Sequence, residues 1–237
     1  MPNGHFHLAQ PQNESVLSFA PGTRERDFLT DALQRAKKTK LDIPMYIGGD
    51  EVRSGKKMEI RPPHQTAHVL GHFHAGDASH VKSAIQQALK AHASWQHMPW
   101  MQRASIFLKA ADLLATKYRY DMLAATMLGQ SKNPFQAEID STCELIDFLR
   151  FNVYFLNEIY KQQPLSGAGM HNRVEYRSLE GFVLAVTPFN FTAIGGNLPT
   201  SAAMCGNVVI WKPANTQIYS AQLFMKILRE AGLPDGV

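Results

Sequence analysis

The sequence predicts an α/β fold with a parallel sheet, and two apolar runs with a helix between them carry that prediction. Gly181–Val186 and Val208–Trp211 are apolar and rich in β-branched residues, as strands buried on both faces of a parallel sheet are. Between them, Ala193–Met204 is small and apolar enough to lie against a sheet as a helix. The order strand, helix, strand predicts a βαβ unit.

Upstream of this unit we expect a loose arm, a few strands and three helices. Residues 1–42 form the predicted N-terminal arm, and residues 43–75 hold hairpin-like strands, with candidates at Met45–Ile47 and Val69–His74. Apolar residues at helical spacing then predict the three helices. Their marker residues are Val81, Ala84, Ile85, Ala88 and Leu89 in the first, Ile106, Phe107, Ala110, Leu113 and Leu114 in the second, and Ile139, Ile146, Leu149 and Val153 in the third, which should run from Pro134 to about Lys161.

Composition predicts a soluble globular protein, because 45% of the residues are hydrophobic, 19% are charged and no apolar run is long enough to cross a bilayer. The net charge of +4 is small and the basic residues are scattered, so a nucleic-acid partner is not expected. Met1–Gln12 resembles neither a secretory signal nor a transit peptide. We therefore expect a cytoplasmic protein, or one of the mitochondrial matrix in a eukaryotic cell.

No metal site is expected. Cys143 and Cys205 lie far apart, with neither a metal-ligand spacing nor a disulfide framework. The histidines lack a cysteine or carboxylate spacing that would complete a tetrahedral set, so we interpret them as surface residues. They are His64, His68, His72, His74 and His80.

Polar residues follow both strands of the predicted βαβ unit. Thr187, Pro188, Phe189 and Asn190 follow the first strand, and Lys212 ends the second. Ligands of open α/β sheets bind beyond the carboxyl ends of the strands, so these residues are the candidate site. Taken alone, the asparagine would also suit a helix cap and the lysine an ordinary solvated strand end. No glycine-rich dinucleotide fingerprint or P-loop occurs.

The stretch from Leu179 to Thr216 resembles the aldehyde dehydrogenase superfamily, whose members carry a Pro-aromatic-Asn turn and then a strand reading Gly-Asn-x-x-x-x-Lys-Pro. Here the turn reads P-F-N-F-T-A-I-G-G-N-L, which is similar to the family's Δ1-pyrroline-5-carboxylate (glutamate γ-semialdehyde) dehydrogenases. Gln136–Asn152 and the motif Gln162-Gln163-Pro164 are similar to the same branch. The resemblance covers most of the chain and is weakest near the N-terminus.

The resemblance implies a partial aldehyde dehydrogenase-like fold. Residues 43–237 would form part of a parallel-sheet NAD-binding domain, with segments of a projecting β arm at about 43–75 and 165–178. His171–Arg177 alternates as a strand does, and the matching family segment pairs with another subunit, so a homo-oligomer is implied. The family's catalytic cysteine and general-base glutamate are expected beyond this chain, whose end we interpret as a truncation that leaves out the catalytic domain.

The resemblance also implies roles for individual residues. Asn190 would stabilise the oxyanion of the reacting aldehyde. The expected cofactor-binding residues are Thr187, Pro188, Phe189, Lys212 and Asn215. Many family members have a glutamate where Asn215 stands, which leaves the choice between NAD and NADP open. Glu144 and Phe191 would contact the substrate; the alternatives are a solvated acidic face with Asp140 and Asp147, and core packing for the phenylalanine.

The activity implied for the whole protein is NAD-dependent oxidation of L-glutamate γ-semialdehyde, derived from 1-pyrroline-5-carboxylate, to L-glutamate in proline catabolism. The substrate would be a small-molecule semialdehyde, and the chain by itself would be inactive. Two alternatives remain open from the sequence. One is a dehydrogenase for another small semialdehyde. The other is a non-catalytic dinucleotide-binding or assembly module, if the chain is naturally this short.

Overall fold

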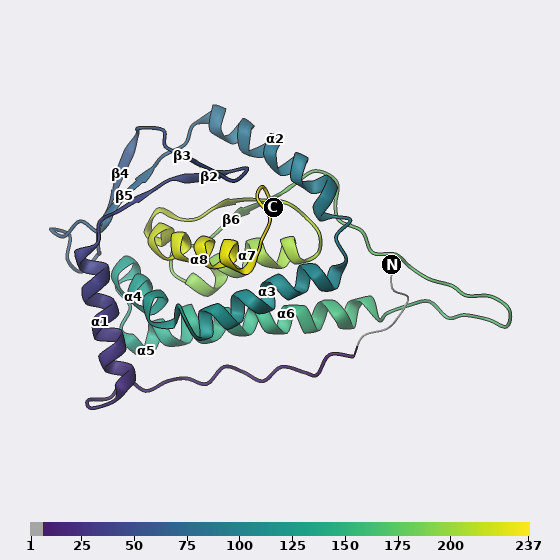
Figure 1. The fold of residues 1–237 in the computed structure, drawn as a ribbon, viewed down its shortest axis with the longest axis horizontal. Coiled ribbons are helices and arrows are strands. Elements are labelled where there is room, and N and C mark those ends of the chain that lie inside the picture. Colours follow the sequence, from purple (N-terminus) through teal and green to yellow (C-terminus); the bar gives the residue numbers. More distant parts are fainter. Residues whose placement is uncertain (1–6) are drawn as a thin grey trace.

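A layer of helices forms the main core of the fold. The computed structural model describes residues 7–237 (Figure 1). The helices are α1 (Arg24–Lys38), α2 (Ala78–Trp95), α3 (Trp100–Ala115), α4 (Arg119–Gln130), α5 (Pro134–Ala137), the π-helix η1 (Glu138–Glu144), α6 (Leu145–Tyr160), α7 (Thr192–Met204), the 3-10 turn η2 (Asn215–Gln217) and α8 (Ile218–Ala231). Helix α3 contacts α6, α7 and α8, and Phe107, Leu149 and Phe224 are buried where these helices meet.

The strands of the described residues form three small sheets. The strands are β1 (Leu41–Ile43), β2 (Met45–Ile47), β3 (Asp50–Val52), β4 (Lys57–Ile60), β5 (Gly71–His74), β6 (Val183–Val186) and β7 (Val209–Lys212). In the first sheet, β5 lies between β1, which is parallel to it, and β4, which is antiparallel. Strands β2 and β3 form the expected hairpin, and its turn residues Gly48 and Gly49 have positive φ angles of 57° and 95°.

The predicted βαβ unit is confirmed. Strands β6 and β7 are parallel, with Val183 opposite Val209 and Val186 opposite Lys212, and α7 connects them. The prediction that the first strand is buried on both faces is wrong. Ala185 is buried, whereas Leu184 and Val186 are 59% and 58% exposed. Alternate strand residues point to opposite faces, and nothing else in the described part of the chain covers the face that these two side chains share.

The third predicted helix is confirmed as one continuous helical run, 134–160, but it contains a π-helical segment that the sequence did not predict. The run begins at a capping box between Asn133 and Gln136. Ile146, Leu149 and Val153 are buried as expected, whereas Ile139 is 36% exposed. The i→i+5 hydrogen bonds of a π-helix widen the turn and shift the register of the apolar stripe, so the prediction for Ile139 is wrong.

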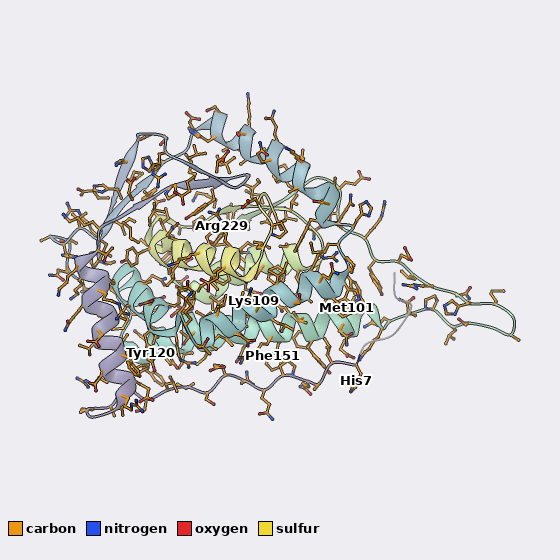
Figure 2. The ribbon with its side chains drawn as sticks, in the orientation of Figure 1. His7, Met101, Lys109, Tyr120, Phe151 and Arg229 are labelled. Atoms are coloured by element: carbon orange, nitrogen blue, oxygen red, sulfur yellow. The ribbon has the colours of Figure 1, made fainter. Side chains whose placement is uncertain are left out.

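The expectation of a loose N-terminal arm is wrong for the residues that the structure describes; residues 1–6 of that arm lie outside them. Helix α1 packs on α4, and the Thr23 side chain caps its N-terminus. Leu29 and Ala32 are buried on its inner face. Tyr120 of α4, labelled in Figure 2, belongs to this interface. Its ring centroid lies 5.3 Å from that of Phe28 in α1.

Residues 7–22, which we call the strap, lie along the helical layer beneath α6 in the view of Figure 1. A largely buried ion cluster fixes the strap there. The Glu14 carboxylate accepts hydrogen bonds from Arg119 Nη1 at 2.7 Å and Arg150 Nη1 at 2.6 Å. Arg119 also pairs with Glu138, whose side chain is fully buried and accepts the Leu17 backbone N–H at 3.0 Å. A buried charge is costly without a partner, so each ion stabilises the others' placement.

The segment after α6 projects from the body as expected (Figure 1). The strand predicted at His171–Arg177 does not form. Instead, the Gln163 side-chain amide makes the two backbone hydrogen bonds that a neighbouring strand would make with Val174. It accepts the Val174 N–H at 2.8 Å and donates to the Val174 carbonyl at 3.3 Å. Leu165 and Met170 near the tip are exposed, at 92% and 62%.

The expectation that the histidines are surface residues is wrong for His74. His74 is buried; its Nδ1 accepts the Gly55 N–H at 3.2 Å, and its Nε2 lies 3.3 Å from Asp42 Oδ1. Across residues 7–237, no group of three or more His, Cys, Asp or Glu side chains is placed to hold a metal ion. No helix in the same range is long and apolar enough to cross a membrane.

Replacing Glu138 with Gln should lower the free energy of unfolding by about 3 kcal/mol, because Arg119 would keep its buried charge with a weaker partner. Chemical denaturation of the complete gene product measures this loss. The matched control is Glu158→Gln in the same helical run, where a partly exposed pair with Lys161 is lost at a cost of about 0.5 kcal/mol or less. Equal losses in the two variants would contradict the structural role of the buried cluster.

Candidate active site

The ends of β6 and β7 meet at one edge of their sheet because the strands are parallel. The Thr187 backbone N–H donates to the Lys212 carbonyl at 3.2 Å. The buried Thr187 hydroxyl accepts a hydrogen bond from Trp211 Nε1 at 3.1 Å. Thr216 then donates to the Phe189 carbonyl at 3.4 Å. The structure therefore brings together the polar residues that follow the two strands, as the sequence predicts.

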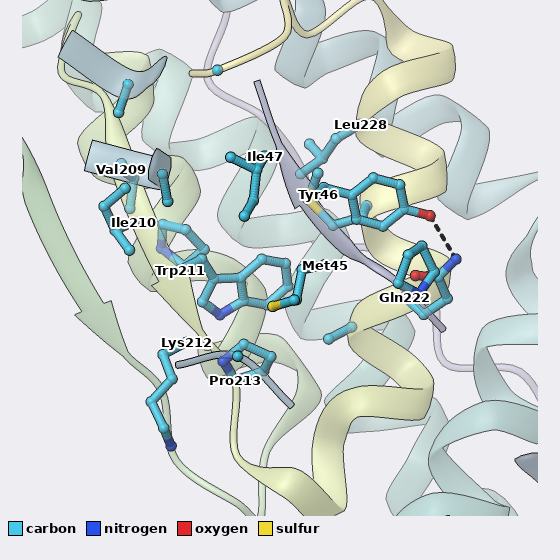
Figure 3. Close-up of a pocket in the computed structure, with 18 of the residues that line it drawn as sticks. Met45, Tyr46, Ile47, Val209, Ile210, Trp211, Lys212, Pro213, Gln222 and Leu228 are labelled. Carbon is cyan, nitrogen blue, oxygen red and sulfur yellow. Dashed lines mark hydrogen bonds between the residues drawn. The ribbon is translucent and has the colours of Figure 1, made fainter. Parts of the chain in front are cut away.

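Lys212 and Asn215 present free donors at this edge. Both residues are exposed, and Asn215 begins the η2 turn. Figure 3 shows the Lys212 side chain extending from the end of β7, away from Trp211 and Met45. Neither side chain has a hydrogen-bond or ion-pair partner within residues 7–237. An ammonium and an amide in this position have the donors and acceptors that the hydroxyl groups of a dinucleotide ribose require.

An apolar cavity of about 620 Å³ adjoins these two residues (Figure 3). Its walls come mainly from β2, β7, α2 and α8, with Tyr46, Trp211 and Gln222 among the lining residues. Lys212 and Asn215 also line the cavity, whereas Thr187, Pro188 and Phe189 do not. The five expected cofactor-binding residues are therefore divided between this cavity and the turn after β6.

The side chain of Asn190 is exposed and has no hydrogen-bond partner in the described part of the chain. The alternative that it caps the next helix is wrong. The N-cap residue of α7 is Phe191, and no side chain of the turn caps that helix. The turn that includes Pro188 and Phe189 therefore leaves the Asn190 side-chain amide exposed at the protein surface.

Asp140, from the π-helix, binds the N-terminus of α7 in place of Asn190. Its Oδ2 accepts the Thr192 N–H at 3.1 Å, and its Oδ1 accepts the Ala193 N–H at 2.9 Å. Lys132 Nζ lies 2.5 Å from Oδ2 and balances the charge. The expectation of a solvated acidic face is wrong for Asp140, which is 2% exposed. Sequence reasoning missed its role because its backbone partners are more than fifty residues away.

Phe191 lies beside the same ion pair. Lys132 Nζ lies 4.4 Å from the centroid of the Phe191 ring, a cation–π contact. The ring is 39% exposed, so it is not simply packed in the core. The adjacent Thr192 hydroxyl is buried, 3.0 Å from the Thr126 hydroxyl and 2.6 Å from Gln130 Nε2. The turn is thus held firmly on its inner side while its outer side stays open.

Glu144 ends the π-helix, which contacts α7. Partial burial, the Asp140 carboxylate and, to a smaller extent, Asp147 raise the pKa of Glu144 above its ordinary value, and Lys132 opposes the shift. Asp147 is occupied by the strap, because it accepts from Asn13 Nδ2 at 2.7 Å and from the Glu14 N–H at 2.8 Å. Glu144 has no such partner within residues 7–237, so its carboxylate is available to a cationic group.

The fold and the site define an α/β protein with a free amide at the turn after the first strand and a free lysine at the end of the second. The profile of the Aldehyde dehydrogenase family matches residues 51–237, and the chain belongs to this family.

The chain is similar to Δ1-pyrroline-5-carboxylate dehydrogenases within the family. It is 53% identical over 234 residues to the Agaricus bisporus protein of that name, covering 98% of this chain and 43% of the relative. The mitochondrial protein of that name from Homo sapiens is 46% identical over 233 residues, covering 98% and 41% of the two chains. The chain therefore spans less than half of the curated relatives it matches.

Solved structures agree with the sequence comparison. The Mycobacterium tuberculosis Δ1-pyrroline-5-carboxylate dehydrogenase bound with NAD matches with a TM-score of 0.96 at 46% identity, over 99% of this chain and 44% of that one. A 1-pyrroline-5-carboxylate dehydrogenase from Thermus with bound NAD matches with a TM-score of 0.89 at 27% identity, over 98% and 45%. The expected aldehyde dehydrogenase-like, partial fold is confirmed.

The raised pKa of Glu144 predicts a pH dependence of stability. The folded state holds the Glu144 proton more tightly than the unfolded state does, so stability falls as pH rises from 4.5, the ordinary value, through the raised folded pKa. Glu144→Gln should abolish this fall. Denaturation midpoints of the complete gene product across that pH window measure it, with Glu158→Gln as the control, because Glu158 is not among the groups that raise the pKa of Glu144. A fall of unchanged size in Glu144→Gln would contradict the assignment.

Proposed function

We propose that the complete gene product oxidises L-glutamate γ-semialdehyde, the open-chain form of 1-pyrroline-5-carboxylate, to L-glutamate with NAD. The observation that carries the proposal is the free Asn190 amide, on a turn whose inner side is fixed and whose outer side is open. The named relatives supply the substrate class. Proline catabolism is the pathway that would supply this semialdehyde.

The oxidation begins when a cysteine thiolate of the whole protein, outside this chain, adds to the aldehyde carbon. The carbonyl electron pair then moves to oxygen, and Asn190 Nδ2 donates a hydrogen bond to the resulting oxyanion. NAD, when bound, would supply the oxidising power, and the hydride that leaves the carbon would be transferred to it. Water then displaces the thiolate, and its oxygen remains in the product carboxylate.

The NAD assignment combines the free donors at the strand ends with the NAD-bound relatives from Mycobacterium tuberculosis and Thermus. Lys212 and Asn215 would hold ribose hydroxyl groups. Thr187, Pro188 and Phe189 would contact the cofactor along the turn after β6, on the sheet edge that Thr187 shares with Lys212. These residues would place the cofactor next to Asn190.

Substrate recognition would involve Glu144 and Phe191. The ionised Glu144 carboxylate would bind the ammonium group of the open-chain semialdehyde, because it has no partner of its own in the described chain. The half-exposed Phe191 ring would line the approach to the aldehyde carbon.

The assembly of the whole protein follows the same proposal. Residues 43–237 would belong to the NAD-binding domain, and the projecting segment 165–178 would pair with a second subunit through side chains such as Leu165 and Met170. A homo-oligomer is therefore expected. The compartment would be the cytoplasm or, in a eukaryotic cell, the mitochondrial matrix; the relatives from Dictyostelium discoideum and Homo sapiens are named mitochondrial.

Two single variants separate the roles of turn and strand end. Asn190→Ala should lower kcat about a hundred- to a thousand-fold and leave the Kd for NAD nearly unchanged, because the amide acts on the oxyanion. Lys212→Ala should weaken NAD binding and leave most of kcat at saturating NAD. Steady-state kinetics and NAD titration of the complete gene product measure both effects. Each variant is the control for the other.

The reverse pattern, or equal losses of kcat and NAD affinity in both variants, would contradict these roles.

Glu144→Gln should raise the KM for glutamate γ-semialdehyde about ten-fold or more, because the substrate ammonium loses a charged partner. The KM for glutarate semialdehyde should stay within about two-fold of its value in the unaltered protein. This substrate has no amino group and so makes no contact that the substitution could remove. The comparison uses the complete gene product. Equal changes in KM for the two substrates would show that the Glu144 carboxylate does not bind the substrate amino group.

A further inference from the structure

Helix α7 begins directly after the turn that carries Asn190, and its first backbone N–H groups need acceptors. An α-helix leaves its first four N–H groups without partners inside the helix. Asparagine is among the residues that most often supply the acceptor, and such a cap stabilises the helix. The Asn190 side-chain oxygen is therefore a natural competitor for the N–H groups of Thr192 and Ala193.

Asp140 removes that competition. Both of its carboxylate oxygens are occupied by α7, one by the Thr192 N–H at 3.1 Å and the other by the Ala193 N–H at 2.9 Å. A carboxylate at a helix N-terminus also interacts favourably with the helix dipole. The helix is capped from a different element, the π-helix, and Asn190 keeps both its donor and its acceptor free.

The counter-ion of Asp140 acts on the same turn. A buried carboxylate needs a cationic partner, and Lys132 Nζ lies 2.5 Å from Oδ2. The same ammonium lies over the Phe191 ring, 4.4 Å from its centroid. The Asp140–Lys132 ion pair therefore contacts Phe191, Thr192 and Ala193, the three residues that directly follow Asn190.

We propose that Asp140 is a positioning residue for Asn190: it takes over the capping of α7, so that the Asn190 amide stays free and directed at the oxyanion. The inference rests on the proposed function of Asn190. Asp140 itself touches neither substrate nor cofactor, and Lys132 holds its carboxylate in place.

The test is Asp140→Asn in the complete gene product. The amide keeps the side-chain volume but has one acceptor oxygen instead of two and gives Lys132 no charge. We expect kcat to fall roughly ten- to a hundred-fold, the cost of misplacing a catalytic group, with the Kd for NAD unchanged. The control is Asp147→Asn in the same helical run, which loses one of its two acceptor oxygens for the strap and should keep kcat within about two-fold.

A double variant separates positioning from general structural damage. If Asp140 acts through Asn190, then adding Asp140→Asn to Asn190→Ala should lower kcat no further, because the group that it positions is gone. Damage to the fold would lower kcat by the same factor in both backgrounds. Asp140→Glu keeps the charge and both acceptor oxygens, and it should retain most of kcat. If Asp140→Asn does not fold, Lys132→Gln replaces it in the cycle, because it removes the counter-ion of Asp140 and leaves both acceptor oxygens in the chain.

Three results would overturn the inference: an unchanged kcat in Asp140→Asn, equal losses in the two backgrounds, or an equal loss in Asp147→Asn. Failure of the proposed function looks different. In that case Asn190→Ala itself keeps full kcat, whatever Asp140→Asn does.

Discussion

The buried carboxylate of Asp140 connects the helical run to the βαβ unit, and the geometry of the candidate site depends on that connection. It binds two backbone N–H groups at the start of α7 and an ammonium from the loop before α5. The π-helix that carries Asp140 is itself fixed by Glu138, which pairs with Arg119 and holds the strap. A charge that is buried must be paired, so these contacts allow little variation in the placement of the turn.

The parallel pairing of β6 and β7 explains why the proposed oxyanion donor, Asn190, and the proposed cofactor-binding residue, Lys212, lie near the same edge of the sheet. Both strands end on the same side, so the turn after β6 lies beside the last residue of β7. Around that edge the Thr187 and Thr192 hydroxyls and the Asp140 carboxylate are hydrogen-bonded. By contrast, Asn190, Lys212 and Glu144 have no side-chain partner within the described residues. Polar groups left free beside satisfied neighbours indicate a binding or catalytic surface better than their sequence positions alone do.

Much of the fold follows from local patterns in the sequence. The βαβ unit and the three helices were predictable because apolar periodicity reports the face of an element that is buried. The π-helix was not predictable from the sequence. Its wider turn changes the apolar periodicity only at Ile139, which is exposed although it belongs to the predicted buried stripe. Helix α1 also has local signals in the sequence, namely the Thr23 cap and the helical spacing of Leu29 and Ala32. The candidate site residues came from strand ends and the family resemblance, whereas Asp140 depends on a contact between segments far apart in sequence.

We propose that this chain carries the oxyanion donor and the cofactor-binding strand end of a glutamate γ-semialdehyde dehydrogenase. The most direct measurement is NADH formation by the unaltered complete gene product with 1-pyrroline-5-carboxylate, compared with succinate semialdehyde and a simple aliphatic aldehyde. We expect kcat/KM to be highest with 1-pyrroline-5-carboxylate and glutamate to accumulate in step with NADH. No NADH with that substrate, or a higher kcat/KM with either of the others, would contradict it.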